Sequence, residues 1–124
     1  MTIRCLAVRR SRFEVEITHD ALEHIRFLPR KHHGLVFRTL RSSLSNEPLH
    51  ETRNRKPLTL PAPFGAHWEL RFGPSNRYRA FYTPDERCIV VVAVGVKERE
   101  RLLIGGKEVF RETRIHRRGQ GAIE

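Results

Sequence analysis

The sequence predicts an α+β fold in which a small, mainly antiparallel sheet is covered on one face by two helices near the N-terminus. Three runs rich in aromatic and β-branched residues, 67–72, 77–82 and 88–97, are separated by turn-forming clusters at 74–76 and 84–86. Such runs are typical of a three-stranded antiparallel meander. Upstream of them, apolar residues recur at helical spacing in two segments, which is typical of helices that pack on a sheet.

Length and charge indicate one basic domain. The chain has 124 residues, enough for one hydrophobic core and too few for two. Twenty-four Lys and Arg against fourteen Asp and Glu give a formal net charge of +10, which favours RNA, DNA, a membrane surface or an acidic protein as partner. A merely basic soluble protein is the alternative, although the arginines cluster at particular places. We expect a basic arm at 1–12, a folded domain at 13–110 and a basic tail at 111–124.

The N-terminal part of the domain predicts a strand followed by two helices. Residues 13–18 alternate with a period of two, as in a strand. Thr18 is placed to cap a helix that opens at His19, and its apolar stripe consists of Ala21, Leu22, Ile25 and Leu28. Pro29 ends this helix or starts the next, whose stripe consists of Val36, Leu40 and Leu44. We expect the two helices to form an antiparallel hairpin on one face of the sheet.

The segments before and after the meander predict irregular structure. Prolines and a glycine in 49–66 favour a loop, which carries a basic patch of Arg53, Arg55 and Lys56. As the simpler alternative, these three side chains only solvate the loop. Alternating charges at 98–101 indicate a solvated edge, and Gly105 with Gly106 indicates a turn.

Alternation within the meander separates a core face from a charged face. Trp68, Leu70 and Phe72 share one side of their strand, whereas His67, Glu69 and Arg71 share the other. In the next strand Arg77, Arg79 and Phe81 alternate with Tyr78, Ala80 and Tyr82. We expect the apolar residues of the first set and both tyrosines to face the core. Arginines that project from strands, not from loops, favour an anionic partner.

Cysteine and histidine usage predicts a cytoplasmic protein without a metal site. Cys5 and Cys88 lack metal-ligand spacing and are expected to be reduced, with Cys88 buried in its strand. Neither a membrane span nor a secretory signal is expected. The adjacent His32 and His33 point in different directions on a helix, so a solvated basic corner is favoured over a ligand pair. The same holds for His19, His24 and His50.

Four motifs in order resemble the toxins of type II toxin–antitoxin systems. They are Arg-Asn-Arg-Lys-Pro-Leu at 53–58, Trp-Glu-Leu-Arg at 68–71, Arg-Tyr-Arg-Ala-Phe-Tyr at 77–82 and Ala-Val-Gly-Val-Lys at 93–97. Together they are similar to the RelE/ParE superfamily, including its cytotoxic translational repressors, over roughly residues 13–109. The resemblance implies a small α+β toxin neutralised by a cognate antitoxin, through which the complex binds operator DNA. RelE-like members cut mRNA in the ribosomal A site, whereas ParE-like members poison DNA gyrase.

The resemblance also implies roles for individual residues. Arg79 matches the strand arginine placed at the scissile phosphate, and Arg71 matches a basic position of the same site. Lys97 lies near the basic residues that follow the last strand, although one additional residue separates Gly95 from that group. The matching tyrosine is absent beyond Lys97, and His116 is a candidate substitute. The expected RNA-binding residues are Arg53, Arg55, Lys56, Arg77, Arg99 and Arg101.

The implied chemistry needs no metal and no cofactor. Attack by a 2′-hydroxyl forms a bond to phosphorus and breaks the bond to the 5′-oxygen, so the hydroxyl must lose a proton and the leaving oxygen must gain one. Preorganised Arg and Lys side chains stabilise the negative charge on the phosphorane between these events. Arginine is a poor proton donor or acceptor, so such a site is expected to depend on the ribosome to position the message. Glu69 is expected to orient an arginine through an ion pair, in preference to acting as the general base. Two alternatives stay open: a gyrase inhibitor that binds through the helical hairpin, and a decayed toxin that mainly binds its antitoxin.

Overall fold

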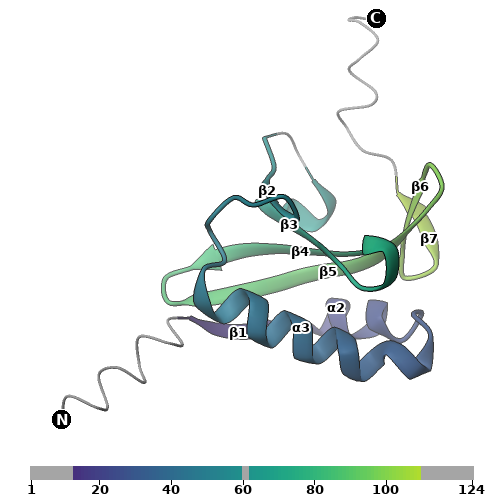
Figure 1. Ribbon diagram of the computed structural model, residues 1–124, viewed down its shortest axis with the longest axis horizontal. Helices are drawn as coiled ribbons and strands as arrows, with labels where there is room; N and C mark the ends of the chain where they lie inside the picture. Colours follow the sequence, from purple (N-terminus) through teal and green to yellow (C-terminus); the bar gives the residue numbers. More distant parts are fainter. Residues whose placement is uncertain (1–12, 60–61, 110–124) are drawn as a thin grey trace, which may run out of the picture.

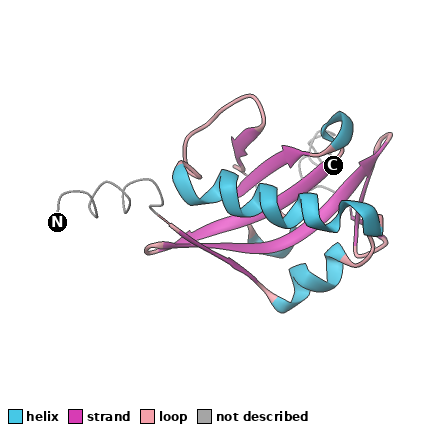
Figure 2. Ribbon diagram, turned by 60° about the horizontal axis from the view of Figure 1, so that its bottom comes forward, coloured by secondary structure: helices cyan, strands magenta, loops and turns pink. Residues whose placement is uncertain are grey.

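A single sheet with two helices on one of its faces makes up the described part of the chain, residues 13–59 and 62–109 of a computed structural model (Figures 1 and 2). The helices are α2 (His19–Ile25) and α3 (His33–Asn46). The strands are β1 (Glu14–Ile17), β2 (Arg55–Pro57), β3 (Trp68–Phe72), β4 (Tyr78–Asp85), β5 (Cys88–Glu98), β6 (Arg101–Ile104) and β7 (Lys107–Val109). Short 3-10 segments lie at η1 (Arg30–His32), η2 (Pro63–Gly65) and η3 (Pro74–Asn76). The predicted α+β class is confirmed.

The sheet is antiparallel except at one strand. Its order is β2-β3-β4-β5-β6-β7, and β1 pairs in parallel with the first residues of β5, so that Glu14 lies opposite Cys88 (Figure 1). The predicted meander corresponds to β3, β4 and β5 and is confirmed. The predicted first strand is also present, although its parallel partner was not foreseen. Antiparallel neighbours need only short turns, and here these turns lie at 73–77 and 86–87.

Both predicted helices are present, and their stripes face the sheet. The hydroxyl oxygen of Thr18 accepts a hydrogen bond from the amide of Ala21 at 3.1 Å, which caps α2 as predicted. Ala21 and Ile25 are buried, but Leu22 is 40% exposed, so its predicted place in the stripe is wrong. In α3 the predicted stripe is confirmed, since Val36, Leu40 and Leu44 are fully buried.

The two helices pack mainly on strands and not on each other. The main contacts of α2 are with β5, and those of α3 are with β1 and η1. Figure 2 shows both helices on the same face of the sheet. The expected antiparallel helical hairpin is therefore not confirmed, because the sheet supplies the apolar surface that each helix covers.

The core lies between the helices and the sheet. Strands contribute Leu70, Phe72, Tyr78, Ala80 and Tyr82 to it, as the alternation predicted. Trp68 packs against this cluster and stacks on Tyr82 with ring centroids 6.3 Å apart. A second, smaller cluster that includes Phe81, Ala93, Leu102 and Ile104 lies on the opposite face.

Two segments that were predicted to be irregular contain strands. The loop 49–66 includes β2, in which Arg55 lies opposite Leu70 of β3. The expected solvated edge at 98–101 is the turn between β5 and β6, and Gly105 with Gly106 forms the predicted turn with φ of +62° and +81°. β2 has only three residues, too few for an alternation to be read from sequence.

Other expectations concern cysteine, the termini and the membrane. Cys88 is half-buried, so its predicted full burial is wrong. The basic arm, Cys5, His116 and the basic tail lie outside the described residues. Neither α2 nor α3, the helices of the described part, has the length and apolar composition to cross a membrane.

Candidate nucleic-acid interface

Strand register brings the predicted catalytic residues onto the face of the sheet that points away from the helices. Arg71 of β3 lies directly opposite Arg79 of β4, and Arg79 lies opposite Gly95 of β5. Glu69 and Lys97 lie two residues from these positions and therefore share their face. The structure thus collects all four side chains from neighbouring strands.

The guanidinium of Arg79 is held inside the protein. Its Nε lies 3.1 Å from the Oε2 of Glu69, and the two side chains are only 9% and 2% exposed. Its Nη1 also donates hydrogen bonds to the carbonyls of Tyr78, at 3.3 Å, and Asn76. The ion pair expected for Glu69 is therefore present. A guanidinium used in this way is not open to a phosphate, so the direct contact inferred for Arg79 does not fit this arrangement.

Arg71 and Lys97 are the more accessible cations of this face. Both side chains are half-buried, and neither forms an ion pair with a carboxylate among residues 13–59 and 62–109. The backbone of Arg71 is fixed by a 2.8 Å hydrogen bond to the carbonyl of Asn54, and that of Lys97 by a 2.7 Å hydrogen bond to the carbonyl of Arg77. Rigid backbones with unneutralised charges are suited to hold an anion.

The predicted patch at 53–56 is divided between the two faces of the sheet. Lys56 lies opposite Glu69 and so shares the face of the strand arginines, with an ion pair to Glu51 at 3.6 Å. Arg55 points to the other face and donates to the carbonyl of His50 at 3.3 Å. Arg53 is exposed. Adjacent residues of a strand point in opposite directions, so the three cations do not act on one ligand together.

The remaining predicted cations gather at the far end of β5. Arg77, Arg99 and Arg101 line a shallow hollow together with Glu98 and Glu100. Arg77 lies 3.8 Å from Glu98, and both side chains are about half exposed. Solvent screens such pairs strongly, so they exchange readily for another anion. This group continues the charged surface beyond Lys97.

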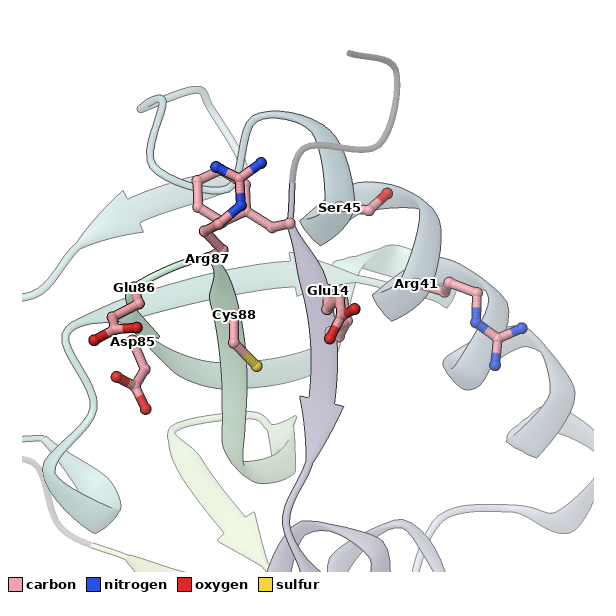
Figure 3. Close-up of a pocket in the computed structure, with 9 residues that line it drawn as sticks. Glu14, Arg41, Ser45, Asp85, Glu86, Arg87 and Cys88 are labelled. Atoms are coloured by element: carbon pink, nitrogen blue, oxygen red, sulfur yellow. The ribbon is translucent and has the colours of Figure 1, made fainter. Parts of the chain in front are cut away.

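A larger hollow lies at the opposite end of β5 and has a different character (Figure 3). Acidic and basic side chains alternate around it: Glu14, Arg41, Asp85, Glu86 and Arg87. The Cys88 thiol donates to the Oε1 of Glu16 at 3.5 Å. Burial, this hydrogen bond and nearby carboxylates raise the pKa of the Cys88 thiol, which disfavours the nucleophilic thiolate. The mixed charges give this hollow no preference for an anion.

Two histidines have structural contacts that sequence reasoning missed. The Nδ1 of His24 accepts a hydrogen bond from the amide of Val94 at 3.3 Å. Val94 lies between the part of β5 that pairs with β1 and the part that pairs with β6. The Nδ1 of His32 lies 2.5 Å from the hydroxyl of Tyr78. These residues are therefore not parts of a solvated corner, and their partners lie at least 46 positions away in the chain, beyond any local signal.

The described residues contain no group of three His, Cys, Asp or Glu side chains arranged to hold a metal ion. The sheet face carries the cations Arg71, Arg79 and Lys97. They attract, orient and stabilise negative charge, and Glu69 fixes one of them in place.

Comparison with known proteins shows the class of fold. No protein-family model matches the chain, and no curated protein matches it significantly. A chain in the crystal structure of the toxin–antitoxin complex RelBE2 from Mycobacterium tuberculosis is similar to it, with a TM-score of 0.55 and 26% sequence identity. The match covers 68% of this chain and 98% of that chain. The fold is thus that of a toxin from a toxin–antitoxin complex, as the resemblance implied.

Proposed function

We propose that this protein is the toxin of a type II toxin–antitoxin module and that it cuts mRNA on the ribosome without a metal. The similarity to a chain of the RelBE2 complex supports the toxin class. The observation that carries the nuclease is the placement of Arg71 and Lys97, on one sheet face and without carboxylate partners among the described residues. A formal net charge of +10 adds a general attraction for RNA.

The proposed site divides its tasks between open and buried cations. Arg71 and Lys97 contact the scissile phosphate and stabilise the charge that develops when the 2′-hydroxyl attacks. Arg79, paired with Glu69, acts as a positioning residue, because it lies opposite Arg71 in the strand register and anchors the sheet face there. Arg77, Arg99 and Arg101 bind the neighbouring phosphates of the message. Arg53, Arg55 and Lys56 contribute through general charge.

The ribosome is proposed as an obligatory partner for a chemical reason. Arginine and lysine stabilise charge well but transfer protons poorly at neutral pH. A site built from them is slow unless the reacting groups are already aligned, and alignment is worth several orders of magnitude in rate. A translating ribosome holds the message in a fixed, extended path. The remaining expected partner is a cognate antitoxin, which neutralises the toxin in the cytoplasm and links it to operator DNA.

One observation favours a second function. Arg79, which the resemblance assigned to the scissile phosphate, is occupied by Glu69. The burial of this arginine is also compatible with a different function, in which the toxin inhibits DNA gyrase and has no nuclease site. A decayed toxin that only binds its antitoxin would have the same buried pair.

Mapping of RNA ends distinguishes these functions. After induction, 5′ ends are mapped by primer extension on a translated message and on the same message without its start codon. We expect codon-phased cuts in the translated message only. Arg71→Ala and Lys97→Ala should each reduce cutting about a hundredfold or more.

Arg38→Ala is the matched control, because Arg38 is an exposed arginine of α3 in the opposite layer. This variant should cut like the wild type. Intact messages accompanied by double-strand DNA breaks would instead establish gyrase as the target. If both the messages and the DNA stay intact, the result supports a decayed toxin that only binds its antitoxin.

A further inference from the structure

A third pocket lies between the residues that follow α2, the start of β4 and the end of β5, next to the hollow lined by Arg77. Its walls are largely apolar and include Phe27, Pro29, Pro74 and Val96. Arg77 and Glu98 line both this pocket and the neighbouring hollow of Arg99 and Arg101. An apolar pocket therefore opens directly beside a group of phosphate-binding candidates.

Phe27 is exposed, and its ring lies beside the turn at Gly106. It is 64% exposed, the highest value among the exposed large apolar residues of the described part of the chain. One side of its ring lies against Gly106, where an added β-carbon would come within 3.0 Å of Cδ1. An aromatic ring that is open to solvent buries little apolar area by itself. Its exposed face is suited to stack on a planar ligand.

The polar part of the pocket is a hydrogen-bonded pair. The Nδ1 of His32 lies 2.5 Å from the hydroxyl of Tyr78, and their rings meet edge to face with centroids 5.7 Å apart. The ring of Tyr78 lies against Gly73, where a β-carbon would come within 2.5 Å of it. Both side chains line the pocket. Tyr78 is only 4% exposed, so its hydroxyl orients the ring of His32, whose other nitrogen is the polar group offered between the apolar walls.

These features match one unstacked base of single-stranded RNA. Proteins that recognise such bases combine an aromatic face for stacking, a few polar groups for the base edge and a cation for the adjoining phosphate. We propose that this pocket binds a single base of the message, which stacks on Phe27 and lies next to His32 and Tyr78. Arg77 holds the neighbouring phosphate. This inference rests on the proposed function, because it assumes that RNA is the substrate.

Binding of two short RNAs tests the pocket. The full-length protein is titrated with an oligouridine of four nucleotides and with an abasic oligomer that has the same number of phosphates. The wild type should bind the oligouridine about fivefold more tightly or better, since stacking of one base on an aromatic ring contributes at least this much. Phe27→Ala should remove the preference without changing affinity for the abasic oligomer, and Phe27→Tyr should restore it.

Phe64→Ala is the matched control, because Phe64 is also exposed, at 53%, but does not line the pocket. It should keep the preference. Equal binding of both RNAs by the wild type would overturn the base pocket while leaving the proposed function intact. Failure to bind either RNA would also overturn the base pocket, whereas the proposed function stands or falls separately with the cuts mapped in the translated message. If Phe27→Ala weakened capture by the cognate antitoxin but left the RNA preference unchanged, the pocket would be an antitoxin site and the inference would be wrong.

Discussion

Glu69 of β3 and Arg79 of β4 form an ion pair of 3.1 Å that is almost completely buried beneath the charged face of the sheet. This pair explains how a strand accommodates a buried arginine. It also affects the interpretation of toxicity in Arg79 variants. Arg79→Ala leaves the carboxylate of Glu69 buried without this partner, so loss of toxicity in that variant would reflect folding as much as chemistry.

The buried pair predicts a large effect of Glu69→Gln on stability. The substitution removes the buried carboxylate that Arg79 pairs with, which should lower the free energy of unfolding by about 3 kcal/mol. Urea denaturation measures this change. Glu51→Gln, which removes an exposed partner of Lys56, should cost well under 1 kcal/mol. Equal effects of the two substitutions would contradict the structural role of the pair.

Protonation of His24 should destabilise the fold. Burial lowers the pKa of His24 below its ordinary value of 6.5, although Asp20 and Glu23 oppose the shift. The unfolded chain then binds more protons, so this contribution to stability is present above pH 6.5 and is lost as the pH falls. Thermal melts at pH 7.5 and 5.5 measure the difference. His24→Gln should reduce it, whereas His50→Gln should not.

The Cys88 thiol should react slowly at neutral pH. Burial and the hydrogen bond to Glu16 raise its pKa, which lowers the thiolate fraction. Alkylation by iodoacetamide, followed by mass spectrometry of the peptide that carries Cys88, measures the rate. Glu16→Gln should accelerate it at pH 7, and Glu23→Gln should have no effect. A native rate equal to that of the urea-unfolded chain would contradict this prediction.

The contact of α3 with the sheet predicts a core cavity in Leu40→Ala. Leu40 is fully buried, so removing its side chain should cost about 2–5 kcal/mol. Leu22→Ala is the control, because Leu22 is 40% exposed on α2 and should contribute under 1 kcal/mol. Chemical denaturation of both variants provides the comparison. An equal loss of unfolding free energy in the two variants would contradict the position of Leu40 in the core.

Elements with a long and regular pattern could be predicted from the sequence. The alternation of β3 and β4, the apolar run of β5 and the stripe of α3 each extend over enough residues to show their period. Thr18 also identified the start of α2 through its capping side chain. By contrast, β2, β6 and β7 have only three or four residues each, and pairing with a neighbouring strand determines them more than local preference does.

The sequence predicted which side of the sheet carries the candidate site, but not which side chains contact one another there. Alternation alone placed Glu69 and Arg71 on one side of a strand, and the resemblance added Arg79 and Lys97. Which arginine Glu69 would neutralise depended on the register between β3 and β4, which the sequence does not specify in detail. The same limit hid the contact between His32 and Tyr78, because the two residues lie on different elements.

The central claim is that open cations on the sheet face act on the RNA backbone. The most direct measurement is the single-turnover rate of mRNA cleavage on purified ribosomes programmed with one message. Wild-type protein and Arg38→Ala should cut at the same rate, and Arg71→Ala and Lys97→Ala should each be slower by about a hundredfold or more while remaining folded. Undiminished cutting by both sheet variants, or no cutting by the wild type, would contradict the account.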